Sequence, residues 1–363
     1  MKIADLTTYF HPQSGGIKRY LIEKAKYLSQ LPYKHLLIIP GIDFKEYYLY
    51  HTKVYEIPSF LIPKTGGYRC FKNITKIKEI LNLEKPDILE VGGSYFLIPL
   101  LKSKKYKLLT FYHSDLETFF YPVPLPKNIK IMLLRKLISK FLAPSDYVIT
   151  PSKKMEERLK EFGLSKVTTI NLGVDTETFK LRKELKNSNE FQRPWKVLYV
   201  GRLSPEKNLD FLIKIFLALP SEKFEVWIVG EGPKRKEIEK FTKKRANTKY
   251  LGYLSDELEL AKLYNQADLL VSASVNETFG LTFLEAQACG CILVAKDFGL
   301  ETQPFKEFLV RDLSFEAFYE SIWKSSLSLS PALKLKISSY VRENFSWKET
   351  FQKLQNLYEK LLN

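Results

Sequence analysis

The sequence has few cysteine, histidine and methionine residues, with three, four and three of them in 363 residues. Three cysteines are an odd number in a long chain, which argues against a disulfide framework and indicates a reducing compartment. No apolar run approaches the roughly 18 residues of a membrane-spanning helix. The first ten residues, MKIADLTTYF, carry Asp5 where a signal peptide would have its apolar core. We therefore expect a cytoplasmic protein that does not span a membrane.

Nothing in the composition indicates a disordered or fibrous chain, because 45% of the residues are hydrophobic and 27% are charged. The length is sufficient for about two domains that each bury a core. Acidic residues are scarce in residues 1–188, which carry 32 Lys and Arg against 18 Asp and Glu. Such a positive field favours an anionic partner, either a membrane surface, a nucleic acid or a charged substrate. A solvated, lysine-rich surface would have the same composition.

Short apolar runs alternate with segments of helical periodicity, which is typical of parallel sheets with crossover helices. The predicted strands are residues 3–6, 36–39, 54–57, 88–91, 108–112, 147–150, 167–170, 197–200, 226–229, 250–253, 269–272 and 292–295. The pattern predicts two doubly wound α/β domains, over residues 1–180 and 195–344, with a polar linker at 181–194. Residues 345–363 have the periodicity of an amphipathic helix, which we expect to pack back on the first domain.

Three predicted strands run into glycine-containing loops that precede predicted helices. Ligands of open α/β sheets bind beyond the carboxyl ends of the strands, where helix N-termini present free N–H groups to anions. The first loop contains Gly15 and Gly16, which would let the backbone approach a ligand closely, although a simple turn is the alternative.

The second loop, VGRLSPEKN, follows Gly201 with the two cations Arg202 and Lys207. Two cations near a helix N-terminus predict a pyrophosphate site. The third loop, VGEGP, repeats the arrangement with Gly230 after the next predicted strand, so both strands could present backbone to one ligand.

Two acids, Glu277 and Glu285, lie in the otherwise apolar and small-residue stretch VNETFGLTFLEAQACG. A helix is predicted to begin near residues 279–281, and eight residues of helix would separate the acids by about 12 Å. This separation exceeds the roughly 5 to 9.5 Å at which carboxylate pairs act on one glycosidic bond. We therefore expect them to hold two ends of an extended ligand, with helix N–H groups near Gly280 on a phosphate. Two surface or capping acids are the alternative.

These strings resemble one enzyme family. NETFGLTFLEAQACG is similar to the Glu-x7-Glu motif of retaining glycosyltransferases of the GT-B fold, specifically glycosyltransferase family 4 (group 1). VGRLSPEKN and VGEGP resemble the family's donor-site loops in the same order, and NLGVDTETF at 171–179 extends the resemblance over nearly the whole chain. The resemblance implies two Rossmann-like, doubly wound domains that face each other across a cleft. It also implies retaining transfer of a hexose of mannose or glucose type from a nucleotide diphosphate sugar to a lipid-linked or glycan acceptor hydroxyl.

The resemblance also implies roles for matching residues. Arg202 and Lys207 would neutralise the donor pyrophosphate. Glu285 would bind the ribose hydroxyls, and Glu277 would bind hydroxyls of the donor sugar. His113, in LLTFYHSDLETFF, matches a histidine beside the transferred sugar, with a histidine bonded to a loop carbonyl as the alternative. Backbone of the donor site is implied at Gly15, Gly16, Gly201, Gly230, Phe279, Gly280 and Leu281.

The chain has no Asp-x-Asp sequence of the kind that binds a metal ion. We therefore expect a metal-independent reaction with no cofactor, in which the cations and helix N-termini stabilise the leaving pyrophosphate. The loop at 296–306 departs from the family pattern, because it has only Gly299 where relatives have paired glycines. A sugar-nucleotide epimerase of the same fold is an alternative function. A basic nucleic-acid-binding module is a weaker one, because it would need neither the two acids nor the two cations.

Residues 125–144, LPKNIKIMLLRKLISKFLAP, interleave basic and apolar side chains. They predict a basic amphipathic helix, which either lies on anionic lipid, at about 1 kcal/mol per well-placed cation, or buries its apolar face in the domain. A peripheral position on the cytoplasmic face of a membrane is therefore open, as is the choice between GDP-mannose and UDP-glucose as donor.

Overall fold

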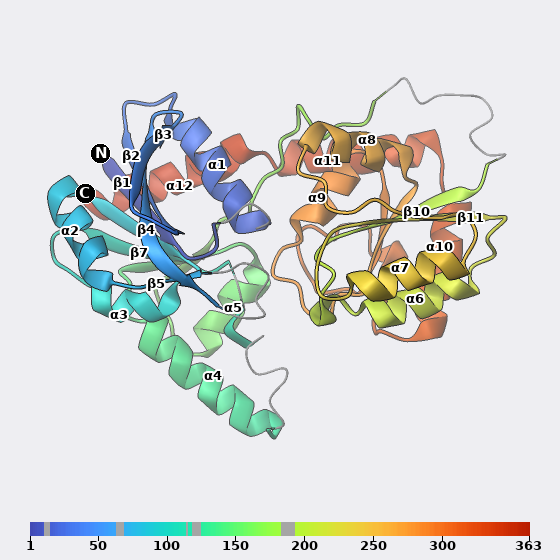
Figure 1. Cartoon of the computed structure of the whole chain (residues 1–363), viewed down its shortest axis with the longest axis horizontal. Coiled ribbons are helices and arrows are strands. Elements are labelled where there is room, and N and C mark those ends of the chain that lie inside the picture. The colour runs from blue at the N-terminus through green and yellow to red at the C-terminus, as the bar shows by residue number, and fades with distance from the viewer. Residues whose placement is uncertain (11–14, 63–68, 114, 118–124, 183–192) are drawn as a thin grey trace. The chain divides into compact units, whose positions relative to one another are not determined.

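The chain forms two compact units (Figure 1). The computed structural model describes residues 1–10, 15–62, 69–113, 115–117, 125–182 and 193–363. Unit 1 comprises Met1–Leu172 and Trp347–Asn363, and unit 2 comprises Gly173–Ser346.

The first unit ends at Leu172, before the boundary predicted after residue 180. The reason is that the intervening residues pack on unit 2, where the Phe179 ring meets the Tyr264 ring edge-on at 6.1 Å between centroids. The Asn265 side chain also donates to the Lys180 carbonyl at 3.0 Å. Of the predicted linker, residues 183–192 lie outside the described part of the chain.

Unit 1 is built on one sheet with the strand order β3-β4-β2-β1-β6-β7-β8-β9, and β5 pairs with β4. The pairs of β4 with β3 and with β5 are antiparallel, and the other pairs are parallel. The strands are β1 (Lys2–Thr7), β2 (Lys34–Gly41), β3 (Lys45–Leu49), β4 (Thr52–Leu61), β5 (Arg69–Phe71), β6 (Ile88–Gly92), β7 (Lys107–Phe111), β8 (Tyr147–Thr150) and β9 (Val167–Thr169). The helices are α1 (Gly16–Leu28), α2 (Ile74–Glu84), α3 (Ile98–Leu101), α4 (Lys127–Leu142), α5 (Lys153–Glu161) and α12 (Trp347–Leu362), with a 3₁₀ turn at Tyr95–Leu97.

The two faces of this sheet differ in chemistry. Successive residues of a strand point to opposite faces, so Ala4 and Leu6 of β1 join the apolar core with residues of α2 to α5. Asp5 lies on the other face, where its carboxylate is 2.8 Å from the Lys24 ammonium of α1. The C-terminal helix α12 packs beside α1 in this unit.

Unit 2 is built on a five-stranded, entirely parallel sheet with the order β12-β11-β10-β13-β14. The strands are β10 (Trp195–Val200), β11 (Phe224–Val229), β12 (Thr248–Tyr250), β13 (Leu269–Ser272) and β14 (Ile292–Ala295). The helices are α6 (Leu209–Ala218), α7 (Arg235–Lys244), α8 (Glu257–Gln266), α9 (Leu281–Ala288), α10 (Phe315–Leu327) and α11 (Pro331–Asn344), with 3₁₀ turns at Pro205–Lys207 and Lys306–Phe308. Helices α6, α7 and α10 cover one face of the sheet, and α8, α9 and α11 cover the other (Figure 1).

The predicted doubly wound α/β architecture is confirmed in both units. All twelve predicted strands overlap observed ones, but β12 ends at Tyr250 and not at Tyr253, because Gly252 takes a left-handed conformation (φ +66°) that interrupts an extended strand. The antiparallel strands β3 and β5 were not predicted. The alternation of apolar runs with helical segments marks only parallel strands that are joined by crossover helices. Phe345 was expected in the last helix, but it precedes α12 and belongs to unit 2.

Candidate active site

Two glycine loops of unit 2 lie against each other at the carboxyl ends of the neighbouring strands β10 and β11. The Gly201 N–H donates to the Val229 carbonyl at 3.1 Å, and the Leu203 N–H donates to the Glu231 carbonyl at 2.9 Å. A Cβ placed on Gly230, whose φ is +142°, would lie 1.8 Å from the Gly201 carbonyl oxygen. The two loops that we expect to present backbone to one ligand are therefore in contact, and only glycine at position 230 permits this close approach.

The predicted donor-site cation Lys207 meets the predicted donor-site acid Glu277. The Lys207 Nζ lies 3.1 Å from Glu277 Oε2 and 3.3 Å from Ser274 Oγ. Both charged side chains are partly buried, with 26% of Lys207 and 16% of Glu277 exposed. The structure thus places a cation and an acid together at the carboxyl ends of β10 and β13.

Lys207 lies in the 3₁₀ turn Pro205–Lys207, which precedes α6. Asn208 takes a left-handed conformation (φ 52°) and separates this turn from α6. Arg202 lies on the same loop with its side chain half exposed, and its guanidinium is 4.0 Å from the Glu206 carboxylate. The loop after β10 therefore carries two cations. Lys207 lies closer to its acid, Glu277, than Arg202 lies to Glu206.

The helix predicted after Glu277 is α9, which begins at Leu281 after Gly280. Gly280 has a φ of +84°, and a Cβ there would lie 2.5 Å from the Phe283 ring, so a side chain is excluded at this N-cap. Glu277 lies in the loop before α9, and Glu285 lies in its second turn. The acids are therefore not eight residues apart on one continuous helix.

Glu285 is 9% exposed and accepts a hydrogen bond from the Tyr264 hydroxyl at 3.1 Å. Burial raises the pKa of Tyr264, and the neighbouring Glu285 carboxylate raises it further, so this hydroxyl stays protonated and available as a donor. Tyr264 thus orients the carboxylate that is predicted to bind the ribose.

The loop at 296–306, whose donor contacts were left open, packs on the start of α9. The Thr302 hydroxyl donates to the Phe279 carbonyl at 2.5 Å, and the Gln287 side chain donates to the Thr302 carbonyl at 2.8 Å. These hydrogen bonds fix the loop at 296–306 against the backbone at Phe279 and against α9.

The predicted residues Gly15, Gly16 and His113 belong to unit 1. Gly15 precedes α1 and Gly16 is its first residue. A Cβ on Gly15 would meet no atom within 4 Å, so no described packing requires glycine there.

His113 lies just beyond β7 and is 8% exposed. Its ring stacks on Phe111 with 4.0 Å between centroids and 5° between the planes. Burial lowers the pKa of His113 to about 3, with a further lowering from the Lys24 charge. The imidazole is therefore neutral near pH 7 and suits a hydrogen-bonding role better than a cationic one.

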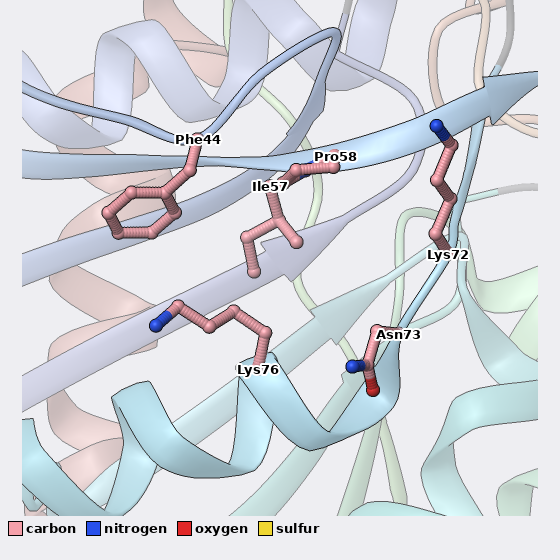
Figure 2. Close-up of a pocket in the computed structure, with 6 residues that line it drawn as sticks. All are labelled: Phe44, Ile57, Pro58, Lys72, Asn73 and Lys76. Carbon is pink, nitrogen blue, oxygen red and sulfur yellow. The ribbon is translucent and has the colours of Figure 1, made fainter.

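A pocket of about 220 Å³ also lies in unit 1, between β4 and the start of α2 (Figure 2). Ile57, Pro58 and the Phe44 ring make its wall apolar, and the Lys76 Nζ lies 4.9 Å from the centre of that ring. No predicted site residue lines it.

The predicted basic amphipathic helix is α4. One stripe, Leu134, Ile138 and Leu142, is buried in the core of unit 1. Ile131 and Met132 in its N-terminal half are 42% and 62% exposed, and this half extends away from the sheet (Figure 1). The helix thus combines a buried face with an exposed apolar one.

Over the described residues, no group of three or more His, Cys, Asp or Glu side chains is arranged to hold a metal ion. Among the helices of that same part of the chain, none is both long enough and apolar enough to cross a bilayer.

The sequence did not predict two further residues of the site. Ser274 contacts Lys207, and Tyr264 contacts Glu285. Ser274 could have been found as a polar residue just past a predicted strand, where ligands of such sheets bind. Tyr264 carries no such signal, because it lies on α8 and meets Glu285 only through the packing of α8 on α9.

Comparisons with known proteins agree over both units. The family model described as Glycosyltransferase Family 4 matches residues 14–178, and the model described as Glycosyl transferases group 1 matches residues 182–308. A GDP-mannose-dependent alpha-(1-6)-phosphatidylinositol dimannoside mannosyltransferase of Mycobacterium tuberculosis is 29% identical over 80% of this chain and 78% of its own. An alpha-monoglucosyldiacylglycerol synthase of Streptococcus pneumoniae is 24% identical over 88% of this chain and 75% of its own.

A solved structure gives the same fold. Sucrose-phosphate synthase from Thermosynechococcus elongatus superposes with a TM-score of 0.79 at 19% identity, covering 99% of this chain and 98% of its own. Likeness at this level of identity supports the architecture alone.

Proposed function

Because the chain belongs to the GT-B glycosyltransferases of group 1 and family 4, we propose that it transfers a hexose from a nucleotide diphosphate sugar to a hydroxyl of a lipid-linked or glycan acceptor, with retention at the anomeric carbon. The observation that carries the proposal is the contact between Lys207 and Glu277 at 3.1 Å. It brings a cation for the pyrophosphate next to the acid that would bind the transferred sugar.

In this proposal the donor lies across the carboxyl ends of β10, β11 and β13. Arg202 and Lys207 face the pyrophosphate, and the N–H groups at the start of α9 meet the phosphate next to the sugar. Glu285, oriented by Tyr264, accepts hydrogen bonds from the ribose hydroxyls. The pyrophosphate would compete with Glu277 for Lys207, which would leave the Glu277 carboxylate available for sugar hydroxyls.

The two cations would also allow the bond between the anomeric carbon and the pyrophosphate oxygen to break without a metal ion. Negative charge grows on the leaving pyrophosphate in the transition state, and preorganised cations and helix N–H groups stabilise it there. His113, neutral near pH 7, would accept or donate a hydrogen bond beside the sugar.

The names of the relatives support a lipid acceptor, and two donors, GDP-mannose and UDP-glucose, are to be compared. The mycobacterial relative is named for GDP-mannose and for a phosphatidylinositol dimannoside, and the streptococcal relative is named for a glucosyldiacylglycerol. GDP-mannose and UDP-glucose are therefore the donors to test first, with glycerol-based lipids as acceptors.

The donor site is tested by calorimetric titration of the protein with GDP and with UDP in EDTA. One nucleotide should bind, and Glu285→Ala and Arg202→Ala should each weaken it by roughly 10- to 100-fold, because each removes a charged hydrogen-bond partner. Glu307→Ala and Arg311→Ala remove the same charges from exposed positions of the same unit and should leave binding unchanged. Binding that needs Mg²⁺, or that survives both site variants, would contradict the proposal.

Under this proposal α4 meets the membrane that carries the acceptor. Its exposed face joins Ile131 and Met132 to the cations Lys127, Arg135, Lys136 and Lys140, and the net charge of the whole chain is +16. Apolar side chains that enter the lipid boundary next to cations are the chemistry of an interfacial helix.

Vesicle sedimentation tests this contact. The protein should bind vesicles that contain phosphatidylglycerol, and Arg135→Ala with Lys136→Ala should weaken binding by roughly 30-fold, at about 1 kcal/mol per cation. Ile131→Ser with Met132→Ser should weaken it as well. Leu327→Ser is the matched control, because Leu327 is 71% exposed but lies on α10 of unit 2. Equal sedimentation of the α4 variants and the unaltered protein would exclude α4 as the contact.

A further inference from the structure

Phe111, Tyr20 and Gly92 of unit 1 lie around the ring of His113. Phe111 stacks on one side at 4.0 Å, and Tyr20 of α1 meets the ring edge-on with 5.0 Å between centroids and 61° between the planes. A Cβ on Gly92 would lie 3.3 Å from the imidazole Cδ2, so this glycine leaves the ring just enough room. Tyr20 is therefore one of the residues that hold the plane of the imidazole.

Tyr20 is itself fixed by a buried carboxylate. Its side chain is fully buried, and its hydroxyl donates to Glu90 Oε1 at 2.7 Å. The other oxygen, Glu90 Oε2, accepts from the Tyr358 hydroxyl of α12 at 2.5 Å. The Lys24 ammonium lies 3.2 Å from Glu90 Oε1 and 2.8 Å from Asp5 Oδ1, so the two buried carboxylates share one cation. Glu90 thus bridges two tyrosines of two helices.

Helix α12 also touches Tyr20 directly. The Phe351 ring lies 5.7 Å and the Trp347 ring 6.4 Å from the Tyr20 ring, between centroids. A buried carboxylate that loses one hydrogen-bond donor must move toward another donor, or one of its oxygens is left without a hydrogen bond. These contacts form a continuous chain from Tyr358 through Glu90 and Tyr20 to His113.

We infer that Tyr20, Glu90 and Tyr358 are positioning residues, through which the C-terminal helix α12 sets the orientation of His113 for the transfer step. The part concerning transfer rests on the proposed function, in which His113 lies beside the sugar. The part concerning the ring orientation rests on the contacts of unit 1 alone.

The test uses the full-length protein with Tyr358→Phe and Tyr20→Phe, which remove one hydroxyl each and keep the rings. The chain has four histidines, so the His113 imidazole resonance can be assigned by its loss in His113→Gln. Both tyrosine variants should shift that resonance. Tyr27→Phe is the matched control, because Tyr27 also lies on α1 and packs 5.4 Å from the Phe351 ring. It should leave the resonance in place.

Kinetics with the nucleotide sugar selected by calorimetry give the second readout. Tyr358→Phe and Tyr20→Phe should lower kcat roughly tenfold, as expected for a misdirected catalytic group, and leave the donor KM within about twofold. Glu90→Gln keeps the shape of the side chain but replaces one acceptor oxygen with an amide donor. It should also shift the resonance, which provides a third variant if one tyrosine variant does not fold.

An unmoved His113 resonance in Tyr358→Phe would overturn the inference, and so would an equal shift in Tyr27→Phe. If the resonance shifts as expected but the unaltered protein transfers no sugar, the proposed function fails and the positioning of His113 stands. If the resonance shifts and kcat is unchanged in an active enzyme, His113 orientation has no part in transfer and the inference is wrong.

Discussion

Lys207→Ala is expected to lower kcat by roughly 100- to 1,000-fold, the usual effect of removing one preorganised group that stabilises transition-state charge. The Lys207 Nζ reaches Glu277 and Ser274 at the carboxyl ends of two neighbouring strands. The charge on a leaving pyrophosphate is larger in the transition state than in the bound donor. The donor KM should therefore rise much less than kcat falls. Steady-state kinetics with the chosen donor measure both.

Lys214→Ala is the control for Lys207→Ala. Lys214 is an exposed residue of α6 in the same unit, so the substitution removes the same charge away from the loop. It should leave kcat unchanged. A loss confined to the donor KM in Lys207→Ala would mean that Lys207 binds the ground state only, and unaltered kinetics would reduce its role to the pairing with Glu277.

Gly230→Ala is expected to destabilise unit 2 by about 3 to 5 kcal/mol and to abolish nucleotide binding. The added Cβ would lie 1.8 Å from the Gly201 carbonyl oxygen, and a φ of +142° is costly for alanine. The backbone around Gly201 cannot move aside as a flexible side chain can, so the loops after β10 and β11 must separate. Denaturant unfolding of the full chain, followed by calorimetric titration with nucleotide, measures both effects.

Gly299→Ala is the control for Gly230→Ala. Gly299 is also left-handed (φ +69°), but a Cβ there would meet no atom within 4 Å. It should cost only about 1 to 2 kcal/mol from its backbone conformation and retain nucleotide binding. Equal destabilisation by both substitutions would show that the backbone conformation, and not the contact between the loops, requires glycine.

The alternation of apolar runs and helical segments was sufficient to predict the architecture. β8, β13 and β14 begin and end at the predicted residues, because they are short, mostly apolar runs in an otherwise more polar sequence. The edge strand β3 escaped prediction because most of its residues are exposed, so it lacks the apolar run that marks a buried strand. The boundary between the units was misplaced because contacts of the Lys180 region with α8 leave no sign in local composition.

The residues of the candidate site also fall into those that the sequence predicted and those that only the structure revealed. The glycines, the two cations and the two acids were predicted because loop chemistry after a strand is a local property, and the family resemblance assigned their roles. The partners that orient them were not. Tyr264, Glu90 and Tyr20 read as ordinary residues of helices and strands until the packing brings them to Glu285 and His113.

The sequence by itself determined that this protein has two α/β units with mainly parallel sheets, and which loops carry the residues proposed for the donor site. Apolar periodicity and glycine placement are local, and a single chain displays them in order. Only the tertiary structure decided that Lys207 meets Glu277, which lies 70 positions further on. It also decided that Tyr358 bonds to Glu90, 268 positions earlier, and so shares this carboxylate with Tyr20. These contacts depend on strand order and helix packing, and many different chain paths are compatible with the same local pattern.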